Sequence, residues 1–382
     1  MIHFEDTIDT IEERQNSKIG KTAALSTVYS ALCQIMRAEG LTYDLVSRSE
    51  ALFTLCTDDI ATDSEKLLAT LFLKSLNKKL HSEVITENIY NRIAGVSQIE
   101  LFDILIAKFP FVKYSQELVN GAIADILREQ ESASIIDIGV GLGTQMVNVI
   151  SRIPANSKLK KLVIVGVEPF TDALAIAEKN ILALKGNVPF ELSFIPVPDY
   201  VENFDFTTLN NLKGSIIVNA SLALHHIKTM EERRATLKNI QALQPVSLFM
   251  IEPNVDHFES NFYKRFVNSW NHFYCLFSVI DQLEITNDQK NGLKLFFGRE
   301  IEDIIGKKEE DRFEKHMPAQ KWIDLLQHSG FTSCSDLLKA SFVAEPGVII
   351  QNQSEGFVGF TYNDETALAL IHAIQQNTPV TK

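Results

Sequence analysis

The sequence predicts an α/β protein in which a doubly wound, parallel sheet is joined to an all-helical cap. The first observation is a series of short apolar segments that alternate with helix-like segments in the middle of the chain. Five of these segments are predicted as buried strands, at 134–139, 162–168, 191–197, 215–220 and 247–253. Helices are expected between them, at 143–153, 170–185 and 229–243. Apolar strands separated by helices are typical of a parallel sheet that is covered on both faces.

The second observation is that the first 110 residues show helical periodicity and no alternation of period two. Apolar residues recur at three- and four-residue intervals from Leu25 to Met36, before Gly40, which indicates an amphipathic helix and its end. A second helix is expected at 64–80, with Ser64 as its cap. Because the segment is large enough for an independent domain, a helical subdomain is favoured over a simple extension packed on the core.

A further helical stretch interrupts the α/β pattern after Pro253. It is rich in Phe, Tyr and Trp, and it ends near the charged run KKEEDRFEK, which is most simply a solvated surface. The α/β pattern resumes with a helix that ends at Gly330 and with two strand candidates, near 338–350 and 356–361. We therefore expect a cap made of 1–110 and 257–316 and a core made of 111–256 and 317–382.

The composition limits the classes of partner. The chain is acidic, with a formal net charge of −13 over 382 residues, whereas a protein that holds DNA through its phosphates needs a basic face. No apolar run reaches about 18 residues, so no membrane span is expected, and the acidic N-terminus does not resemble a secretory signal. The four cysteines are far apart, which fits a reduced, cytoplasmic compartment without disulfides or a metal site.

Three glycines stand where the first strand leads into a helix, in the stretch DIGVGLGT. Gly139, Gly141 and Gly143 permit positive φ and let a ligand approach the main chain. In the dinucleotide pattern G-x-G-x-x-G the third glycine comes one residue later. Together with Asp137 the glycines form D-x-G-x-G-x-G, which resembles the pattern of S-adenosylmethionine-dependent methyltransferases. That resemblance implies that these four residues bind the cofactor.

Polar residues at the next strand ends extend this candidate site. Glu168 ends the second strand, where a carboxylate can accept both hydroxyls of a ribose; alternatively, it caps the helix that follows. Asp199 comes after the third strand, where methyltransferases commonly contact the adenine amino group, although Pro198 and Tyr200 equally suit an ordinary turn. Asn219, near the end of the fourth strand, is expected to be a further cofactor contact.

The fourth and fifth strands end in candidates for chemistry. In an open α/β sheet the ligand lies beyond the carboxyl ends of the strands. His225 and His226 follow the fourth strand and Glu252 ends the fifth, so we expect these three residues to orient or deprotonate an acceptor atom. Asn254 and His257, slightly further on, are expected to contact the substrate. The alternative is that one histidine of the pair packs in the core while the other faces solvent.

Several blocks follow one another in a recognisable order. The stretch PFVKYSQELVNGAI precedes SIIDIGVGLGTQ, and VNASLALHHI follows. Next come MIEPNVDHFESNFYKRFVNSWNHFYCLF and FFGREIEDII, and finally KWIDLLQHSGF and GFVGFTYNDETALALIHAI. This order resembles the VHIID, PFYRE and SAW regions of the GRAS family, best known as plant transcriptional regulators, with bacterial relatives that look like methyltransferases. The resemblance covers roughly residues 20–375.

The resemblance implies a Rossmann-like, methyltransferase-like core and a helical cap formed by the N-terminal region and the insertion. Plant members usually lose the glycine-rich loop, whereas this chain keeps it, which implies binding of S-adenosylmethionine, with S-adenosylhomocysteine as the product. One hypothesis is methylation of a small molecule in a pocket between core and cap, with aromatic residues of 258–277 among its walls. The alternative is a non-catalytic GRAS-type module for ligand binding or regulation. Homodimerisation is left open.

Overall fold

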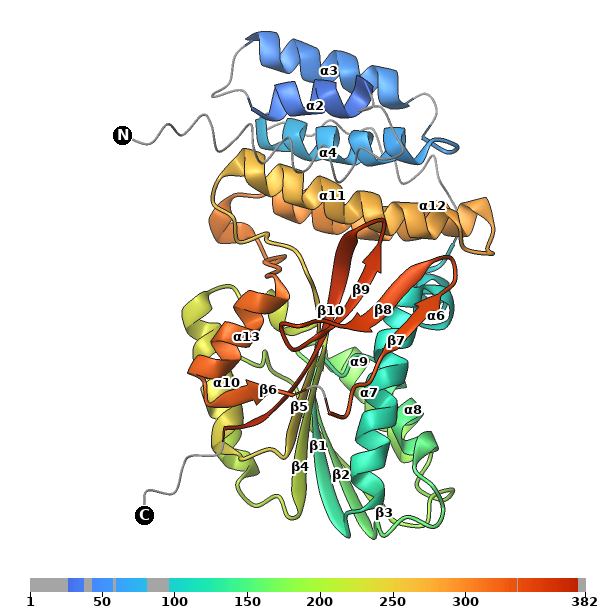
Figure 1. The fold of residues 1–382 in the computed structure, drawn as a ribbon, viewed down its shortest axis with the longest axis vertical. Coiled ribbons are helices and arrows are strands. Elements are labelled where there is room, and N and C mark those ends of the chain that lie inside the picture. Colours follow the sequence, from blue (N-terminus) through green and yellow to red (C-terminus); the bar gives the residue numbers. More distant parts are fainter. Residues whose placement is uncertain (1–26, 38–42, 58–59, 81–95, 335, 377–382) are drawn as a thin grey trace. The chain divides into compact units, whose positions relative to one another are not determined.

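The computed structural model describes residues 27–37, 43–57, 60–80, 96–334 and 336–376, and Figure 1 shows the path of the chain with the labels used below. The chain divides into two compact units, which are described separately. The helical unit comprises Met1–Leu101, Glu259–Arg312 and Asn363–Glu365. The sheet unit comprises Phe102–Phe258, Phe313–Tyr362 and Thr366–Lys382.

The helical unit is built from helices of ten residues or more. They are α2 (Thr27–Met36), α3 (Tyr43–Thr57), α4 (Ser64–Leu80), α11 (Phe262–Asp281) and α12 (Asn287–Ile301), and a π-helical turn, Glu302–Gly306, continues α12. At the start of α4 the carboxylate of Asp63 accepts the backbone N–H groups of Glu65 and Lys66 at 3.1 and 3.0 Å. Asp63 is therefore the cap of this helix, and the expectation that Ser64 caps it is wrong by one residue.

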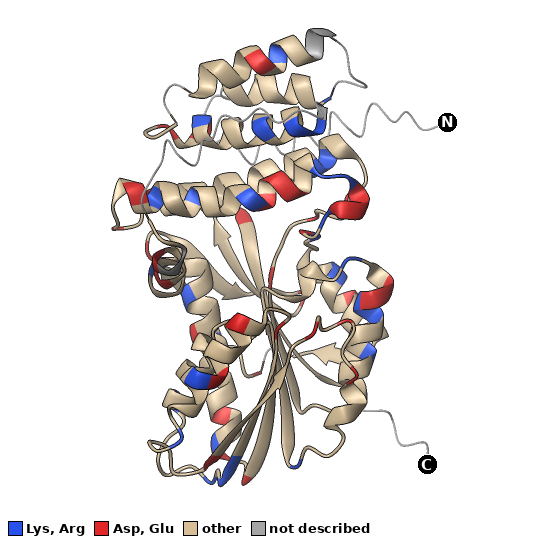
Figure 2. Cartoon of the chain, turned by 180° about the vertical axis from the view of Figure 1, so that it is seen from behind, with Lys and Arg blue, Asp and Glu red and all other residues tan. Residues whose placement is uncertain are grey.

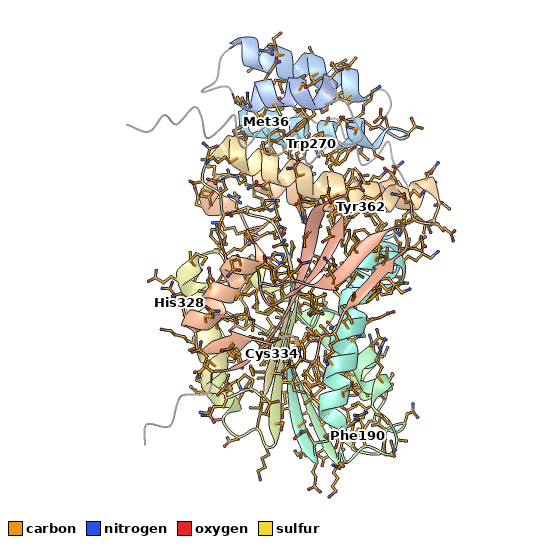
Figure 3. All side chains as sticks on the ribbon, viewed as in Figure 1. Met36, Phe190, Trp270, His328, Cys334 and Tyr362 are labelled. Carbon is orange, nitrogen blue, oxygen red and sulfur yellow. The ribbon has the colours of Figure 1, made fainter. Side chains whose placement is uncertain are left out.

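The aromatic residues of α11 mainly form the core of the helical unit. The ring of Trp270, labelled in Figure 3, stacks on Tyr29 with centroids 5.1 Å apart. Phe72 of α4 meets Phe266 edge-on at 5.3 Å, an arrangement that contributes about 0.5–1.5 kcal/mol beyond area burial. Because Phe266 and Phe273 are fully buried, their observed role is packing. The pocket walls expected from 258–277 stay a prediction.

The sheet unit contains parallel strands in the order β3-β2-β1-β4-β5. Their bounds, each within two residues of the predicted strand, are β1 (Ser132–Ile138), β2 (Lys161–Val167), β3 (Glu191–Val197), β4 (Ser215–Ser221) and β5 (Ser247–Pro253). Helices precede and connect them: α6 (Gln98–Lys108), whose residues up to Leu101 belong to the helical unit, α7 (Pro110–Arg128), α8 (Thr144–Arg152), α9 (Thr171–Leu182) and α10 (Met230–Ala242). The fold is thus mixed α/β, and its parallel strand ends lie at one edge of the sheet.

The C-terminal strands are antiparallel to their neighbours, so the sheet is mixed and the predicted parallel sheet describes only its central part. They follow α13 (Ala319–His328) and are β6 (Phe331–Ser333), β7 (Ser341–Ala344), β8 (Val348–Asn352), β9 (Val358–Tyr362) and β10 (Glu365–Gln375). β10 pairs with β5, and β9, β8 and β7 extend the sheet beyond it. The strand β10 is not predicted from the sequence, because it is buried between β5 and β9 and lacks the alternation of a half-buried strand.

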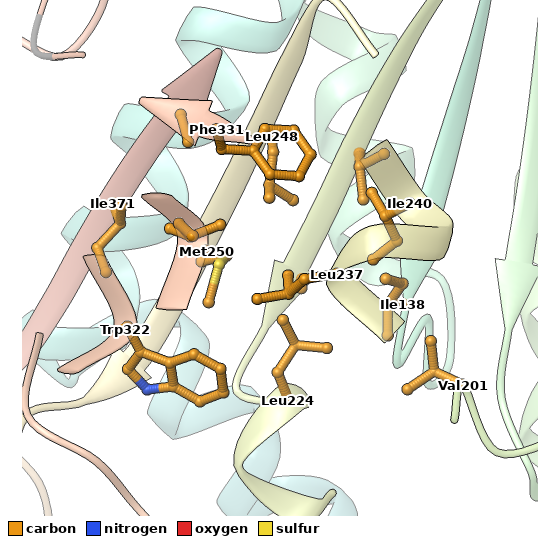
Figure 4. Close-up of a cluster of buried hydrophobic side chains, with 14 of the residues drawn as sticks. Ile138, Val201, Leu224, Leu237, Ile240, Leu248, Met250, Trp322, Phe331 and Ile371 are labelled. Carbon is orange, nitrogen blue, oxygen red and sulfur yellow. The ribbon is translucent and has the colours of Figure 1, made fainter. Parts of the chain in front are cut away.

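An apolar layer joins α10 and α13 to the sheet. In Figure 4, Trp322 of α13 and Leu237 of α10 lie with Met250 of β5 and Ile371 of β10 in one cluster. All four side chains are almost completely buried. Dense packing of this kind leaves little freedom for the strands beneath, so the ends of β4 and β5 are held firmly in place.

Charged residues lie mainly on helices and at strand ends. In Figure 2 the inner stretches of the strands are almost uniformly free of Lys, Arg, Asp and Glu, while both signs of charge occur along the helices. Within the described part of the chain, none of the helices combines the length and the apolar character needed to cross a bilayer.

The junction between β1 and β4 generates a stability prediction. Gly214, directly before β4, has a φ of +84°, and a Cβ there would lie 2.0 Å from the carbonyl oxygen of Ser132. We expect Gly214→Ala to lower the free energy of unfolding by about 2 kcal/mol or more, since both the backbone conformation and the space exclude a methyl group. Gly186→Ala is the control, because a Cβ at Gly186 meets nothing within 4 Å. Identical urea denaturation curves for Gly214→Ala and the parent would contradict the prediction.

Candidate functional site

The glycine turn links β1 to α8, and its three glycines have different roles. All three have positive φ, at +74° for Gly139, +53° for Gly141 and +77° for Gly143. A Cβ at Gly139 would lie 2.8 Å from the Cβ of Ala223, and one at Gly143 would lie 3.1 Å from the Cα of Ala177. A Cβ at Gly141 would meet only a backbone oxygen at 4.0 Å. Gly139 and Gly143 therefore permit close packing, whereas Gly141 borders open space.

Glu168, directly after β2, places its carboxylate at this turn. One carboxylate oxygen accepts the backbone N–H of Gly141 at 3.2 Å, and the other accepts the N–H of Phe170, also at 3.2 Å. Phe170 precedes α9, so the helix-cap alternative for Glu168 is realised in part. The contact with Gly141 is an additional one, and it brings the negative charge of Glu168 to the open space beside the turn.

A buried chain of polar side chains lies behind the turn. Asn219 of β4 donates to the carboxylate of Asp137 at 2.7 Å and to Gln145 Oε1 at 3.2 Å, and Gln145 donates to Asn120 at 3.1 Å. Burial raises the pKa of Asp137 to about 7; the bond from Asn219 opposes this rise, and the charge of Glu168 adds to it. The amide oxygen of Asn219 is buried without a hydrogen-bond partner among the described residues.

Asp199 lies apart from this polar chain. Its carboxylate accepts the N–H of the next residue, Tyr200, at 2.8 Å, as expected for an ordinary turn. Asp199 is half-buried and lines an open depression beside β3, together with Pro198 and Phe204. Contact with a cofactor stays a prediction for this residue.

The expected pair of His225 and Glu252 forms at the ends of β4 and β5. His225, in the 3-10 helix η2 (Leu224–His226), places its Nδ1 2.6 Å from Glu252 Oε2. The other oxygen of Glu252 accepts the N–H of Leu224 at 2.8 Å. Burial acts to lower the pKa of His225, but the carboxylates of Glu252 and Glu314 outweigh it and raise this pKa to about 10. His225 and Glu252 thus form a buried, charged hydrogen-bonded pair.

Two residues that the sequence pattern did not single out complete the histidine cluster. Glu314 Oε2 lies 3.4 Å from His225 Nε2 and 3.2 Å from His316 Nε2. His316 Nδ1 lies 2.9 Å from Nδ1 of His257, which is fully buried. We call His225, Glu252, His257, Glu314 and His316 the His–Glu cluster. Glu314 lies within the charged run KKEEDRFEK and His316 directly follows it. The side chain of Glu314 is only 17% exposed and His316 is buried, so the expectation that this run is a solvated surface is wrong for this end of it.

His226 is the more exposed member of the histidine pair, as the alternative for this pair expects. Its side chain is 51% exposed, and its Nδ1 lies 3.8 Å from Glu314 Oε1. The positive charge of neighbouring His225, together with partial burial, lowers the pKa of His226 to about 4. His226 is therefore neutral at physiological pH.

Asn254 joins secondary-structure elements. Its amide nitrogen donates to the carbonyl of Thr366 at 2.9 Å, and its amide oxygen accepts the N–H of Ala319 at 2.7 Å. These bonds tie the start of α13 to the start of β10. Both ends of the side chain are occupied by backbone groups, so substrate binding by Asn254 has no support in this geometry.

A buried arginine connects the segments of the His–Glu cluster. Arg233 of α10 is fully buried. Its Nη2 donates to the carbonyls of His225 and Lys315, both at 2.7 Å, and its Nε donates to that of Ile227 at 2.9 Å. The guanidinium also lies 4.6 Å from the ring centroid of Phe258, within the range of a cation–π contact. One side chain therefore fixes the loop after β4 relative to the segment before α13.

A match to a family model identifies the family of this chain. The model of the GRAS domain family matches residues 51–369, most of the chain. The chain belongs to the GRAS domain family.

Curated relatives of this GRAS chain occur in plants. Scarecrow-like transcription factor PAT1 of Arabidopsis thaliana is 27% identical over 257 residues, which cover 63% of this chain and 52% of that relative. Scarecrow-like protein 21 of the same plant is 26% identical over 262 residues, with 65% and 62% covered. The solved structure of SCL7 of Oryza sativa matches with a TM-score of 0.75 at 19% identity, over 91% of this chain and 99% of that one, which shows a shared fold. The GRAS chain thus matches about half to three fifths of the length of these two curated relatives.

The raised pKa of Asp137 generates a prediction for pH dependence. The folded-state pKa of about 7 lies above the value of about 4 for an unfolded aspartate. As pH rises between these two values the unfolded state loses its proton first, so the stability of the GRAS chain falls across this window and levels off above it. Asp137→Asn should remove this part of the slope. Unfolding free energies measured from about pH 5 to 8 should therefore differ increasingly between variant and parent, and a constant difference would contradict the raised pKa.

Arg233 generates a prediction for stability. Arg233→Lys keeps the charge, but an ammonium cannot reproduce the planar set of donors to three carbonyls. We expect the free energy of unfolding to fall by about 2–3 kcal/mol, since buried carbonyl groups lose a charged donor. Arg234→Lys changes the exposed neighbour in the same way and should stay within about 0.5 kcal/mol of the parent. Thermal unfolding measures the stability of both variants. Similar losses of stability in Arg233→Lys and Arg234→Lys would show that the buried hydrogen bonds of Arg233 contribute little.

Proposed function

We propose that this GRAS chain is a regulatory module that binds a nucleoside-type small molecule, S-adenosylmethionine or S-adenosylhomocysteine, at the glycine turn, without a need for turnover. The observation that carries the proposal is the open space in front of Gly141 beside the carboxylate of Glu168. The helical unit as a lid, a homodimer and a cytoplasmic location stay predictions.

The residues at the turn fit such a ligand. Each carboxylate oxygen of Glu168 accepts one backbone N–H and keeps acceptor capacity for a ribose hydroxyl. The absence of a side chain at Gly141 lets the ligand approach the main chain. Asp137 and Asn219 lie behind the turn in a buried hydrogen-bonded pair and would hold the turn in shape. S-adenosylmethionine, when bound, would supply an activated methyl group.

The regulatory part of the proposal draws on the family. PAT1 is named a transcription factor, and the chain matches it over about half of its length. A module that senses a metabolite at a nucleoside site can shift between conformations only as far as its affinity for that metabolite differs between them. Gly139 and Gly143 would be kept for packing in either function, so Gly141 and Glu168 are the residues that support ligand binding in particular.

Methyl transfer to a small molecule is the second candidate, and the pair of His225 and Glu252 favours it. The two side chains lie 2.6 Å apart at the strand ends, in the part of an open α/β sheet where substrates bind. Because its raised pKa keeps His225 protonated, this side chain can orient an acceptor as a hydrogen-bond donor, and positioning of this kind lowers a reaction barrier. This candidate requires release of S-adenosylhomocysteine over time.

Calorimetry and a turnover assay separate these functions. The purified chain is titrated with S-adenosylmethionine and with S-adenosylhomocysteine, and it is then incubated with S-adenosylmethionine and the small-molecule fraction of a cell extract. Saturable binding of both ligands without formation of S-adenosylhomocysteine supports the regulatory proposal. Formation of S-adenosylhomocysteine over time supports methyl transfer if the His225→Gln variant suppresses it. Absence of binding by both ligands contradicts both functions.

The role of Gly141 generates a further prediction. Asn tolerates positive φ better than most residues, so Gly141→Asn should fold while its side chain fills the open space. We expect its affinity for S-adenosylmethionine to fall at least tenfold, with a near-parental circular dichroism spectrum. Glu168→Gln should weaken binding by about 1.5–3 kcal/mol, through loss of a charged acceptor. Gly186→Asn, placed after α9 outside the turn, is the control. If Gly141→Asn binds S-adenosylmethionine as tightly as the parent, the ligand does not bind at the glycine turn.

A further inference from the structure

Three side chains from separate segments converge in the His–Glu cluster. The ring nitrogens Nε2 of His225 and His316 lie 3.4 and 3.2 Å from the same atom, Glu314 Oε2. These three donor atoms all lie within 4.8 Å of one another, and all three residues belong to the sheet unit. Two imidazoles and one carboxylate are a ligand set that holds metal ions in proteins.

The distances suit one tetrahedral ion. Zn²⁺ binds imidazole nitrogen and carboxylate oxygen at about 2.0–2.2 Å, so two ligand atoms of a tetrahedral site lie about 3.3–3.6 Å apart. Both distances to Glu314 Oε2 are close to this range. The donor atoms of His225 and His316 lie within 4.8 Å of each other, so the two imidazole rings would need to close by up to about 1.5 Å around a bound ion.

Each histidine is oriented by a partner on its other ring nitrogen. His225 Nδ1 lies 2.6 Å from Glu252 Oε2, and His316 Nδ1 lies 2.9 Å from His257 Nδ1. On binding, the ion would displace the proton from Nε2 of His225, and with the remaining proton of each ligating ring on Nδ1 both Nε2 atoms would bind the ion through a lone pair. Carboxylates and other acceptors commonly orient metal-bound histidines in this way and fix their tautomer.

The backbone around the cluster is fixed before any ion arrives. Arg233 Nη2 donates to the carbonyls of both His225 and Lys315, and the backbone N–H of His257 donates to the carbonyl of His316 at 3.0 Å. The three segments that carry the ligands and their partners are thus joined by direct hydrogen bonds. Such support holds ligand atoms close to the geometry that binding requires.

We propose that His225, Glu314 and His316 form a binding site for one divalent cation of the Zn²⁺ class. Two imidazoles favour Zn²⁺ and its first-row neighbours over Ca²⁺ and Mg²⁺, which prefer oxygen ligands. With three protein ligands, a fourth position is open to water or another molecule, as in catalytic zinc sites. This site is separate from the glycine turn and does not depend on the proposed function. It also departs from the expectation, based on the cysteines, that the chain has no metal site.

The test uses the full chain after treatment with a chelator. Zn²⁺ is titrated by calorimetry, and Co²⁺ is added separately because its visible absorption reports its coordination. We expect one equivalent of Zn²⁺ and a tetrahedral Co²⁺ spectrum. Glu314→Gln and His316→Gln should each weaken Zn²⁺ binding by at least about 100-fold, and Glu252→Gln, which changes a positioning residue, by about 10–100-fold. His328→Gln is the control, since His328 is exposed on α13 (Figure 3).

Several outcomes would overturn the proposal. Without a metal the cluster can instead act as a set of ion pairs, in which protonated His225 lies between two carboxylates. Absence of a saturable equivalent of Zn²⁺, or equal affinity in the parent and in folded Glu314→Gln and His316→Gln, would support that interpretation. If these variants do not fold, the Co²⁺ spectrum of the parent is the test. An intense near-ultraviolet thiolate band would show that a cysteine binds the ion and would overturn the proposed site. A tetrahedral spectrum without that band supports the proposed site.

Discussion

The His–Glu cluster depends on one buried guanidinium. Arg233 binds carbonyls from the loop after β4 and from the segment before α13, so it joins two parts of the chain that are far apart in sequence. Burying a charge is costly unless it is fully hydrogen-bonded. Backbone carbonyls at Nε and Nη2 and the ring of Phe258 supply most of the compensation here, while Nη1 is buried without a hydrogen-bond partner among the described residues. Without these contacts the segment of His225 would no longer be held against the segment of Glu314. The cluster would then lose the geometry on which its chemistry depends.

Much of the fold follows from local sequence, and the exceptions have physical causes. The parallel strands are recognisable because burial on both faces demands continuous apolar runs. Burial equally hides β10, whose Ala and Leu residues carry no strand period, so only its pairing with β5 defines it. At the site, the glycines and Glu168 could be predicted because their roles depend on neighbours in sequence. Glu314 and His316 could not, because their charged segment gains its burial from tertiary contacts alone.

The glycine turn shows why a retained motif does not by itself identify an enzyme. Gly139 and Gly143 are required by the close approach of Ala223 and Ala177, and this demand persists whether or not a cofactor binds. Gly141 has no such constraint and borders open space. A glycine that the packing does not require, such as Gly141, is therefore more informative about ligand binding than the whole pattern.

The position of β10 has a consequence for synthesis of the chain on the ribosome. β5 is translated long before its antiparallel neighbour, so one edge of the parallel sheet lacks its partner while more than a hundred residues are still being added. An unpaired apolar edge is a template for incorrect pairing. The sheet can be completed only after residues 365–375 have emerged. This GRAS chain should therefore require protection by chaperones during translation more than a protein whose strands pair in the order in which they are made.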